Sequence, residues 1–153
     1  MILIAHRGLI DGPNRELENS PDQIQTALNA GFDVEIDLWI HENNLMLGHD
    51  EPQYKISRDF LEQDKFWIHA KNLEALVWLT TTDYNYFWHQ NDDFVITSKQ
   101  FIWTFPGKKL TSRSISVMPE WMDPDLKDVD LICWGICSDY VSKIKKTIAI
   151  SQS

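Results

Sequence analysis

The sequence lacks any apolar run long enough to span a bilayer. Its first residues, MILIAH, are apolar but too few for a signal peptide and have no basic lead-in, so they indicate a strand instead. Cysteine is scarce: only Cys133 and Cys137 are present, which favours buried free thiols in a reducing compartment, with a disulfide or a metal pair as the alternative. We therefore expect a cytoplasmic protein without a membrane span.

Positive charge is also scarce. The chain has 14 Lys and Arg against 23 Asp and Glu, which gives a formal net charge of −9. Such a surface repels polyphosphate, so duplex DNA or RNA is not expected as a partner. One small basic group, Lys143, Lys145 and Lys146, is interpreted as the solvated end of a helix.

No repeat, low-complexity tract or long linker divides the 153 residues, and 43% of them are hydrophobic, so a single domain over residues 1–153 is predicted. Strand-like segments are expected at residues 2–6, 32–40, 45–47, 66–71, 84–89, 94–97, 101–105, 115–118 and 131–137. Helices are expected to start near residues 20, 56, 72 and 140. The first of these begins with strong signals, because Ser20 can cap it and Pro21 suits its first position.

The alternation of strands and helices predicts a mainly parallel sheet with its site at the C-terminal edge. A full eight-unit barrel takes about 250 residues, so the fold class predicted is α/β, a compact or incomplete TIM-type (β/α) barrel. Several strands would then be bare on their outer side. Exposed apolar strands seek a partner, so a homodimer through residues 84–105 is expected.

Four polar clusters fall at the predicted strand ends. They are His6-Arg7-Gly8, Glu35-Ile36-Asp37, His49-Asp50 and His69-Ala70-Lys71. Alternate strand positions share a face, so Glu35 and Asp37 point the same way. Two inward carboxylates cannot stay ionised without partners, and a hard divalent cation such as Mg²⁺ or Ca²⁺ removes that penalty.

Two histidines near such an ion can serve as general base and general acid on a phosphate ester. Taken singly, each cluster has a plainer interpretation: a solvated strand face for Glu35 and Asp37, and a turn for His49-Asp50. The order and spacing of the clusters together favour a catalytic site.

The runs ILIAHRG, LENS, VEIDLWI and LMLGHD resemble the N-terminal signature of the glycerophosphodiester phosphodiesterase family, part of the PLC-like phosphodiesterase superfamily. The resemblance covers about the first third of the chain, and GICSDY near its end is similar to the family's closing strand. It implies a PLC-like phosphodiesterase barrel and a hydrolase of lipid metabolism. The roles it implies are acid and base for His6 and His49, phosphate or substrate contacts for Arg7, Lys71, Glu18 and Asn19, and metal ligands for Glu35 and Asp37.

The sequence departs from the family pattern in two places. His69-Ala70-Lys71 stands where the family has Glu-x-Lys, so His69 would be the third ligand. Imidazole suits Mn²⁺ better than Mg²⁺ or Ca²⁺, which makes Mn²⁺ the alternative metal. The long insertion that usually follows the second histidine is absent, and this short variant is expected to accept a different substrate.

The leading hypothesis is thus a metal-dependent phosphodiesterase acting on a glycerophosphodiester or a related sugar or polyol phosphodiester. One alternative is a degenerate domain that binds a phosphorylated sugar or polyol without turnover, and another is a flavodoxin-like interaction domain. Four residues are weaker candidates for the site, each with a structural role as its alternative: His89, Trp103, Glu120 and Trp121.

Overall fold

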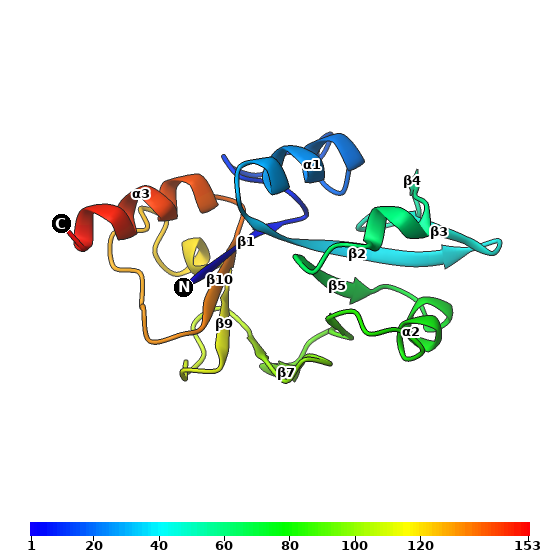
Figure 1. The fold of residues 1–153 in the computed structure, drawn as a ribbon. Coiled ribbons are helices and arrows are strands. Elements are labelled where there is room, and N and C mark those ends of the chain that lie inside the picture. Colours follow the sequence, from blue (N-terminus) through cyan, green and yellow to red (C-terminus); the bar gives the residue numbers. More distant parts are fainter.

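Ten strands form one curled sheet, and three α-helices pack beside it in the computed structural model, which describes residues 1–153 (Figure 1). The strands are β1 (Ile2–His6), β2 (Asp33–His41), β3 (Asn44–Leu47), β4 (Tyr54–Lys55), β5 (Phe66–Ala70), β6 (Tyr86–Phe87), β7 (Phe94–Ile96), β8 (Ile102–Thr104), β9 (Ser114–Val117) and β10 (Gly135–Ser138). The helices are α1 (Pro21–Asn29), α2 (Leu73–Leu79) and α3 (Val141–Ser151), with short 3₁₀ turns η1 (Arg58–Leu61) and η2 (Pro119–Trp121).

The sheet mixes parallel and antiparallel pairs. Strand β1 lies between β2 and β10, and the parallel pairing continues from β2 through β5 to β6 and from β10 through β9 to β8. Strands β3, β4 and β7 pair antiparallel. The first and last strands of the sequence, β1 and β10, are therefore neighbours near the middle of the sheet.

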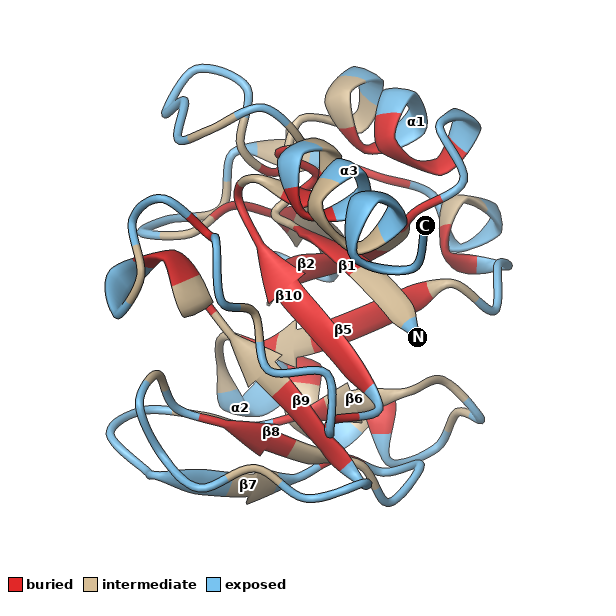
Figure 2. Cartoon of the chain, turned by 90° about the vertical axis from the view of Figure 1, so that its left-hand side faces the viewer, coloured by how far each residue is buried: buried red, intermediate tan, exposed pale blue.

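The predicted compact or incomplete TIM-type barrel of the PLC-like kind is wrong. The sheet curls into a half-barrel, and it is a mixed sheet with only three helices. No α-helix lies between Leu79 and Val141, because the chain joins β6, β7, β8, β9 and β10 through turns and loops. Figure 2 shows α1 and α3 together on the upper side and β7, β8 and β9 on the lower side, away from both.

The helix boundaries follow the sequence signals. The Ser20 hydroxyl accepts a hydrogen bond from the Gln23 backbone N–H, and Pro21 opens α1. Asn72 caps α2 in the same way, with its side chain accepting from the Ala75 N–H. Both helices then place an apolar stripe against the sheet, and the largest core cluster lies between them and β2.

Strand β2 separates two environments. Val34, Ile36 and Leu38 are fully buried in the core beneath the helices, whereas Glu35 and Asp37 face the inner side of the curl. This alternation is the one the sequence predicts. The inner side holds a second apolar cluster, which consists of Ile4, Trp67, Phe87, Trp103, Ile115 and Cys137. The polar residues at the strand ends lie next to this second apolar cluster, as the stacking of Phe87 on His69 shows.

Three other expectations concern the cysteines, a membrane span and the dimer interface. Cys133 and Cys137 are buried and free, as predicted. None of the helices has the length and apolar character needed to cross a membrane. Phe94 and Ile96 are half or more exposed on β7, within the segment expected to form a dimer interface, and the homodimer stays a prediction.

The core beneath the helices should carry most of the stability. Replacing Ile36, which is fully buried, with alanine should lower the free energy of unfolding by about 2–5 kcal/mol, because the lost contacts leave a cavity. The matched change Ile96→Ala, at a side chain that is 68% exposed, should cost less than about 0.5 kcal/mol. Urea denaturation followed by circular dichroism measures both, and equal losses would contradict this assignment of the core.

Candidate functional site

The register of three parallel strands, β1, β2 and β5, brings the polar side chains of the site together. In β2, Glu35 is level with His6 of β1, and Asp37 is level with His69 of β5. Because all four side chains point to the inner side, the pairing places two carboxylates between two imidazoles. The carboxylates are only 2% and 1% exposed. Partners within the fold must therefore replace the water they lose.

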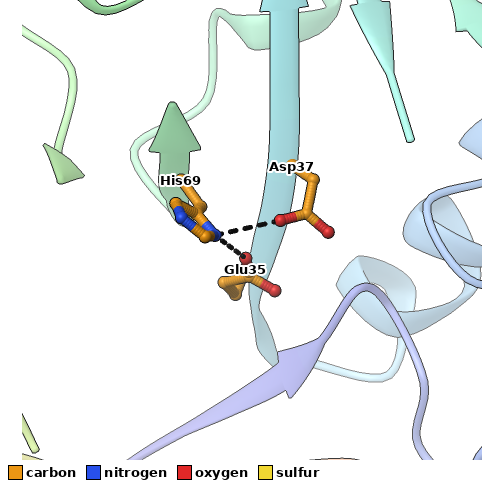
Figure 3. A group of neighbouring side chains, drawn as sticks. All are labelled: Glu35, Asp37 and His69. Carbon is orange, nitrogen blue, oxygen red and sulfur yellow. Dashed lines mark ion pairs between the residues drawn. The ribbon is translucent and has the colours of Figure 1, made fainter. Parts of the chain in front are cut away.

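Glu35, Asp37 and His69 form a possible metal site. One ligand atom from each lies within 4.8 Å of the others. His69 Nδ1 is 3.1 Å from Asp37 Oδ1 and 4.0 Å from Glu35 Oε1. Figure 3 shows the imidazole reaching from β5 toward the two carboxylates of β2. The predicted convergence of these three residues is confirmed.

The ring of His69 is held in one orientation. Its Nε2 lies 3.0 Å from the carbonyl oxygen of His89, and a carbonyl only accepts, so Nε2 carries the hydrogen. Phe87 stacks on the ring with centroids 5.1 Å apart. Nδ1 is thereby directed at the carboxylates, where it can offer a lone pair to an ion or, when protonated, pair with Asp37. Such outer hydrogen bonds commonly orient metal-binding histidines.

The carboxylate of Asp37 is held by several polar partners. Its Oδ2 accepts a 2.8 Å hydrogen bond from Asn19 Nδ2, and Arg7 Nε lies 3.3 Å away as an ion pair without hydrogen-bond alignment. Burial would raise the pKa of Asp37, but the hydrogen bond from His69 and the charges of His69, Arg7 and Lys71 hold it well below its usual range. The pKa of Glu35, by contrast, is raised by burial and by the charge of Asp37.

Glu18 and Asn19 contact residues of the site but do not line its cleft. Asn19 is fully buried and also accepts a hydrogen bond from the Asp37 backbone N–H, so it fixes that carboxylate. Glu18 accepts a 3.0 Å hydrogen bond from Arg7 Nη1. Neither residue lines the cleft described below, although the resemblance assigns them to the substrate side. Their contacts position Asp37 and Arg7.

His6 has a partner that the sequence reasoning missed. Its Nδ1 lies 2.7 Å from Asp139 Oδ1, and its Nε2 is 3.9 Å from Glu35 Oε2. Burial would lower the pKa of His6, but the hydrogen bond to Asp139 and the charge of Glu35 outweigh it and raise the pKa. The available signal was the place of Asp139, directly after the last strand and beside β1.

Glu120 supports this pair and stands outside the metal cluster. Its carboxylate accepts hydrogen bonds from Ser138 Oγ, at 2.9 Å, and from the Asp139 backbone N–H, at 3.0 Å. The weaker hypothesis that Glu120 supplies a missing metal ligand finds no support, since the cluster consists of other residues. Glu120 instead holds Asp139 in place for His6.

His49 reaches the site from the antiparallel strand β3. The Gly48 carbonyl accepts a 2.6 Å hydrogen bond from Trp39 Nε1, which ties the turn to β2. A Cβ at Gly48 would lie 1.9 Å from the Glu51 carbonyl oxygen, so only glycine fits there. The His49 side chain is 35% exposed and pairs with Asp50. Burial and the charge of Arg7 lower its pKa.

The three possible metal ligands, His6, Arg7 and His49 open into one cleft of about 410 Å³. Its polar lining consists of His6, Arg7, Glu35, Asp37, His49, His69, Lys71, His89 and Gln90, and its apolar lining of Phe87, Trp103, Phe105, Pro106, Val117, Met118 and Trp121. A larger hollow of about 880 Å³ lies at the opposite strand ends, near Ile2 and Trp67, but contains none of the clustered ligands. The smaller cleft is therefore the candidate site. His89 and both tryptophans named as weaker candidates line it.

Comparison of the chain with protein families, with curated proteins and with solved structures finds no match. The resemblance to the glycerophosphodiester phosphodiesterases therefore stays a prediction. The function must be argued from the geometry of this cleft.

The first prediction for the site concerns cation binding. Titration calorimetry at neutral pH should detect one Mn²⁺ bound per chain, because both carboxylates and His69 Nδ1 can act as ligands. Asp37→Asn should abolish this binding, whereas Asp125→Asn, at an exposed side chain that pairs with Lys127, should leave it unchanged. Circular dichroism confirms that each variant is folded. Undiminished binding in Asp37→Asn would rule out this site.

The second prediction concerns His6. Because its pKa in the folded chain is raised, its stabilising contribution is present below the unfolded pKa and is lost as pH rises through the folded pKa. Asp139→Asn removes the negative partner, so the pKa of His6 should fall. Titration of the histidine ring signals by NMR, in EDTA, measures the change, with Asp130→Asn as the control. An unchanged pKa in Asp139→Asn would contradict the pairing.

Proposed function

We propose that this chain is a metal-dependent phosphodiesterase that cleaves a glycerophosphodiester or a related sugar or polyol phosphodiester. One observation carries the proposal: the buried group Glu35, Asp37 and His69 opens into the same cleft as His6 and His49. A cation site that shares one cleft with two histidines and two cationic side chains matches the needs of phosphate ester cleavage.

The cleft is suited to an anion although the chain as a whole is acidic. Arg7 and Lys71 both line it. Arg7 uses Nη1 for Glu18, and its Nη2 makes no hydrogen bond to the chain. Lys71 has no ion-pair partner within 4.0 Å. Both cations therefore keep donors for phosphate oxygens, and Arg in particular matches the geometry of phosphate.

The proposed metal ligands fit a divalent cation. Two carboxylates suit Mg²⁺ or Ca²⁺, and the imidazole of His69 shifts the preference toward Mn²⁺. When bound, the cation would polarise a phosphoryl oxygen and offset the negative charge that develops there. Asn19 and the His89 carbonyl hold the ligands in orientation before any ion arrives.

The two histidines would divide the proton transfers. One accepts the proton of the attacking hydroxyl, from water or from a neighbouring hydroxyl of the substrate, as the new P–O bond forms. The other donates a proton to the departing alcohol oxygen as the old P–O bond breaks. Asp139 holds the ring of His6 through Nδ1, which leaves Nε2 for the transfer. A cyclic phosphate would result where the attacking hydroxyl adjoins the ester.

The alternative function is binding of a phosphorylated sugar or polyol without turnover. Its support is the imidazole of His69 where the family pattern has a carboxylate, since a ligand set with less negative charge holds Mg²⁺ or Ca²⁺ less well. The two proposals share the cleft and differ only in whether an ester bond is broken.

Hydrolysis of bis(p-nitrophenyl) phosphate with Mn²⁺ tests the proposal. Of His6→Ala and His49→Ala, the change that removes the general base should lower turnover by about 10²–10⁴-fold, the usual contribution of a positioned base. The other should lower it less, because p-nitrophenolate departs without a proton. The matched change His41→Ala, at a side chain that is 59% exposed, should leave turnover unchanged.

Full activity in both His6→Ala and His49→Ala would contradict the mechanism. Binding of Mn²⁺ and inorganic phosphate by the native chain, without any turnover, would favour the binding function instead.

A further inference from the structure

The cleft has an apolar wall that the proposed proton transfers do not use. Phe105, Pro106, Met118 and Trp121 form it, on the connections that follow β8 and β9. Trp121 is 62% exposed and Phe105 is 40% exposed, although both are large and apolar. Exposed aromatic side chains at the mouth of a polar cleft commonly mark a ligand-binding surface.

This wall is held rigidly by the catalytic side of the cleft. Trp121 ends η2, and the residue before it, Glu120, is buried and bonded to Ser138 and Asp139. The backbone that carries Trp121 is thus fixed to the same residue that orients His6. Phe105 stands edge-on to the Trp121 ring, at 77° and 6.4 Å between centroids. No aromatic ring stacks in parallel on the Trp121 indole.

Polar groups without partners lie in the same cleft. His89 Nδ1 is buried and makes no hydrogen bond. It is 3.9 Å from Asp92, too far to bond. Gln90 lies beside it and is exposed. A buried ring nitrogen without a partner costs free energy, and the His89 side chain around it, which is 19% exposed, lines the cleft.

We propose that the organic group of the phosphodiester is a pyranose sugar, which places one face against Trp121 and its hydroxyls toward His89 and Gln90. The inference rests on the proposed function, since the phosphate must lie at Arg7 and Lys71. A pyranose combines an apolar C–H face with a polar rim, and it packs on a single aromatic face. A nucleobase would use the same indole face, and thymidine monophosphate is therefore the competing compound in the test.

Calorimetry with Mn²⁺ tests the inference without requiring turnover, with four monophosphates: glucose 6-phosphate, cyclohexylmethyl phosphate, methyl phosphate and thymidine monophosphate. Glucose 6-phosphate should bind most tightly, cyclohexylmethyl phosphate less tightly because it lacks hydroxyls, and methyl phosphate weakly. Trp121→Ala should weaken glucose 6-phosphate about 3- to 10-fold and leave methyl phosphate unchanged, while Trp121→Phe should keep most of the affinity. His89→Ala should reduce the preference for glucose 6-phosphate over cyclohexylmethyl phosphate.

Trp134→Ala provides the matched control, because Trp134 is 43% exposed and lies at the opposite strand ends. It should bind all four compounds as the native chain does. Equal binding of glucose 6-phosphate and methyl phosphate, tighter binding of thymidine monophosphate, or no dependence on Trp121 would overturn the inference. Any of these can occur while diester hydrolysis persists, and sugar-selective binding can occur without hydrolysis, so the two proposals fail separately.

Discussion

The structure of this site depends on one constraint: two carboxylates, Glu35 and Asp37, are buried on the same face of one strand. Removing one partner from a buried ion pair costs about 3–5 kcal/mol, because the remaining charge has no water to stabilise it. The neighbouring elements all supply such partners: β1 leads into Arg7, the loop before α1 brings Asn19, and β5 brings His69. This demand accounts for the polar strand ends that open into the cleft.

Much of the site could be predicted from local pattern. Period-two alternation placed Glu35 and Asp37 together, and the same parity argument placed His69 beside them, because parallel strands of one sheet align their C-terminal ends. Capping signals also located α1. These features depend on a few neighbouring residues and on rules of pairing that hold in any sheet.

The remainder depends on contacts between distant parts of the chain. The barrel prediction failed because local pattern does not show how distant strands pair: β3, β4 and β7 pair antiparallel, and the sheet curls only into a half-barrel. Asp139 was missed as the partner of His6, since the two are 133 positions apart and meet only because β1 and β10 pair. Of the apolar wall, only Trp121 was a candidate, and a weak one, because a tryptophan is more often part of a core.

A crystal structure of the chain soaked with Mn²⁺ and inorganic phosphate tests the central claim most directly. The account predicts an anomalous peak about 2.0–2.2 Å from oxygens of Glu35 and Asp37 and from His69 Nδ1, near the usual range for such ligands. The phosphate should lie beside it, within hydrogen-bond distance of Arg7. A map without metal at these three residues, with His69 still paired to Asp37, would contradict the claim.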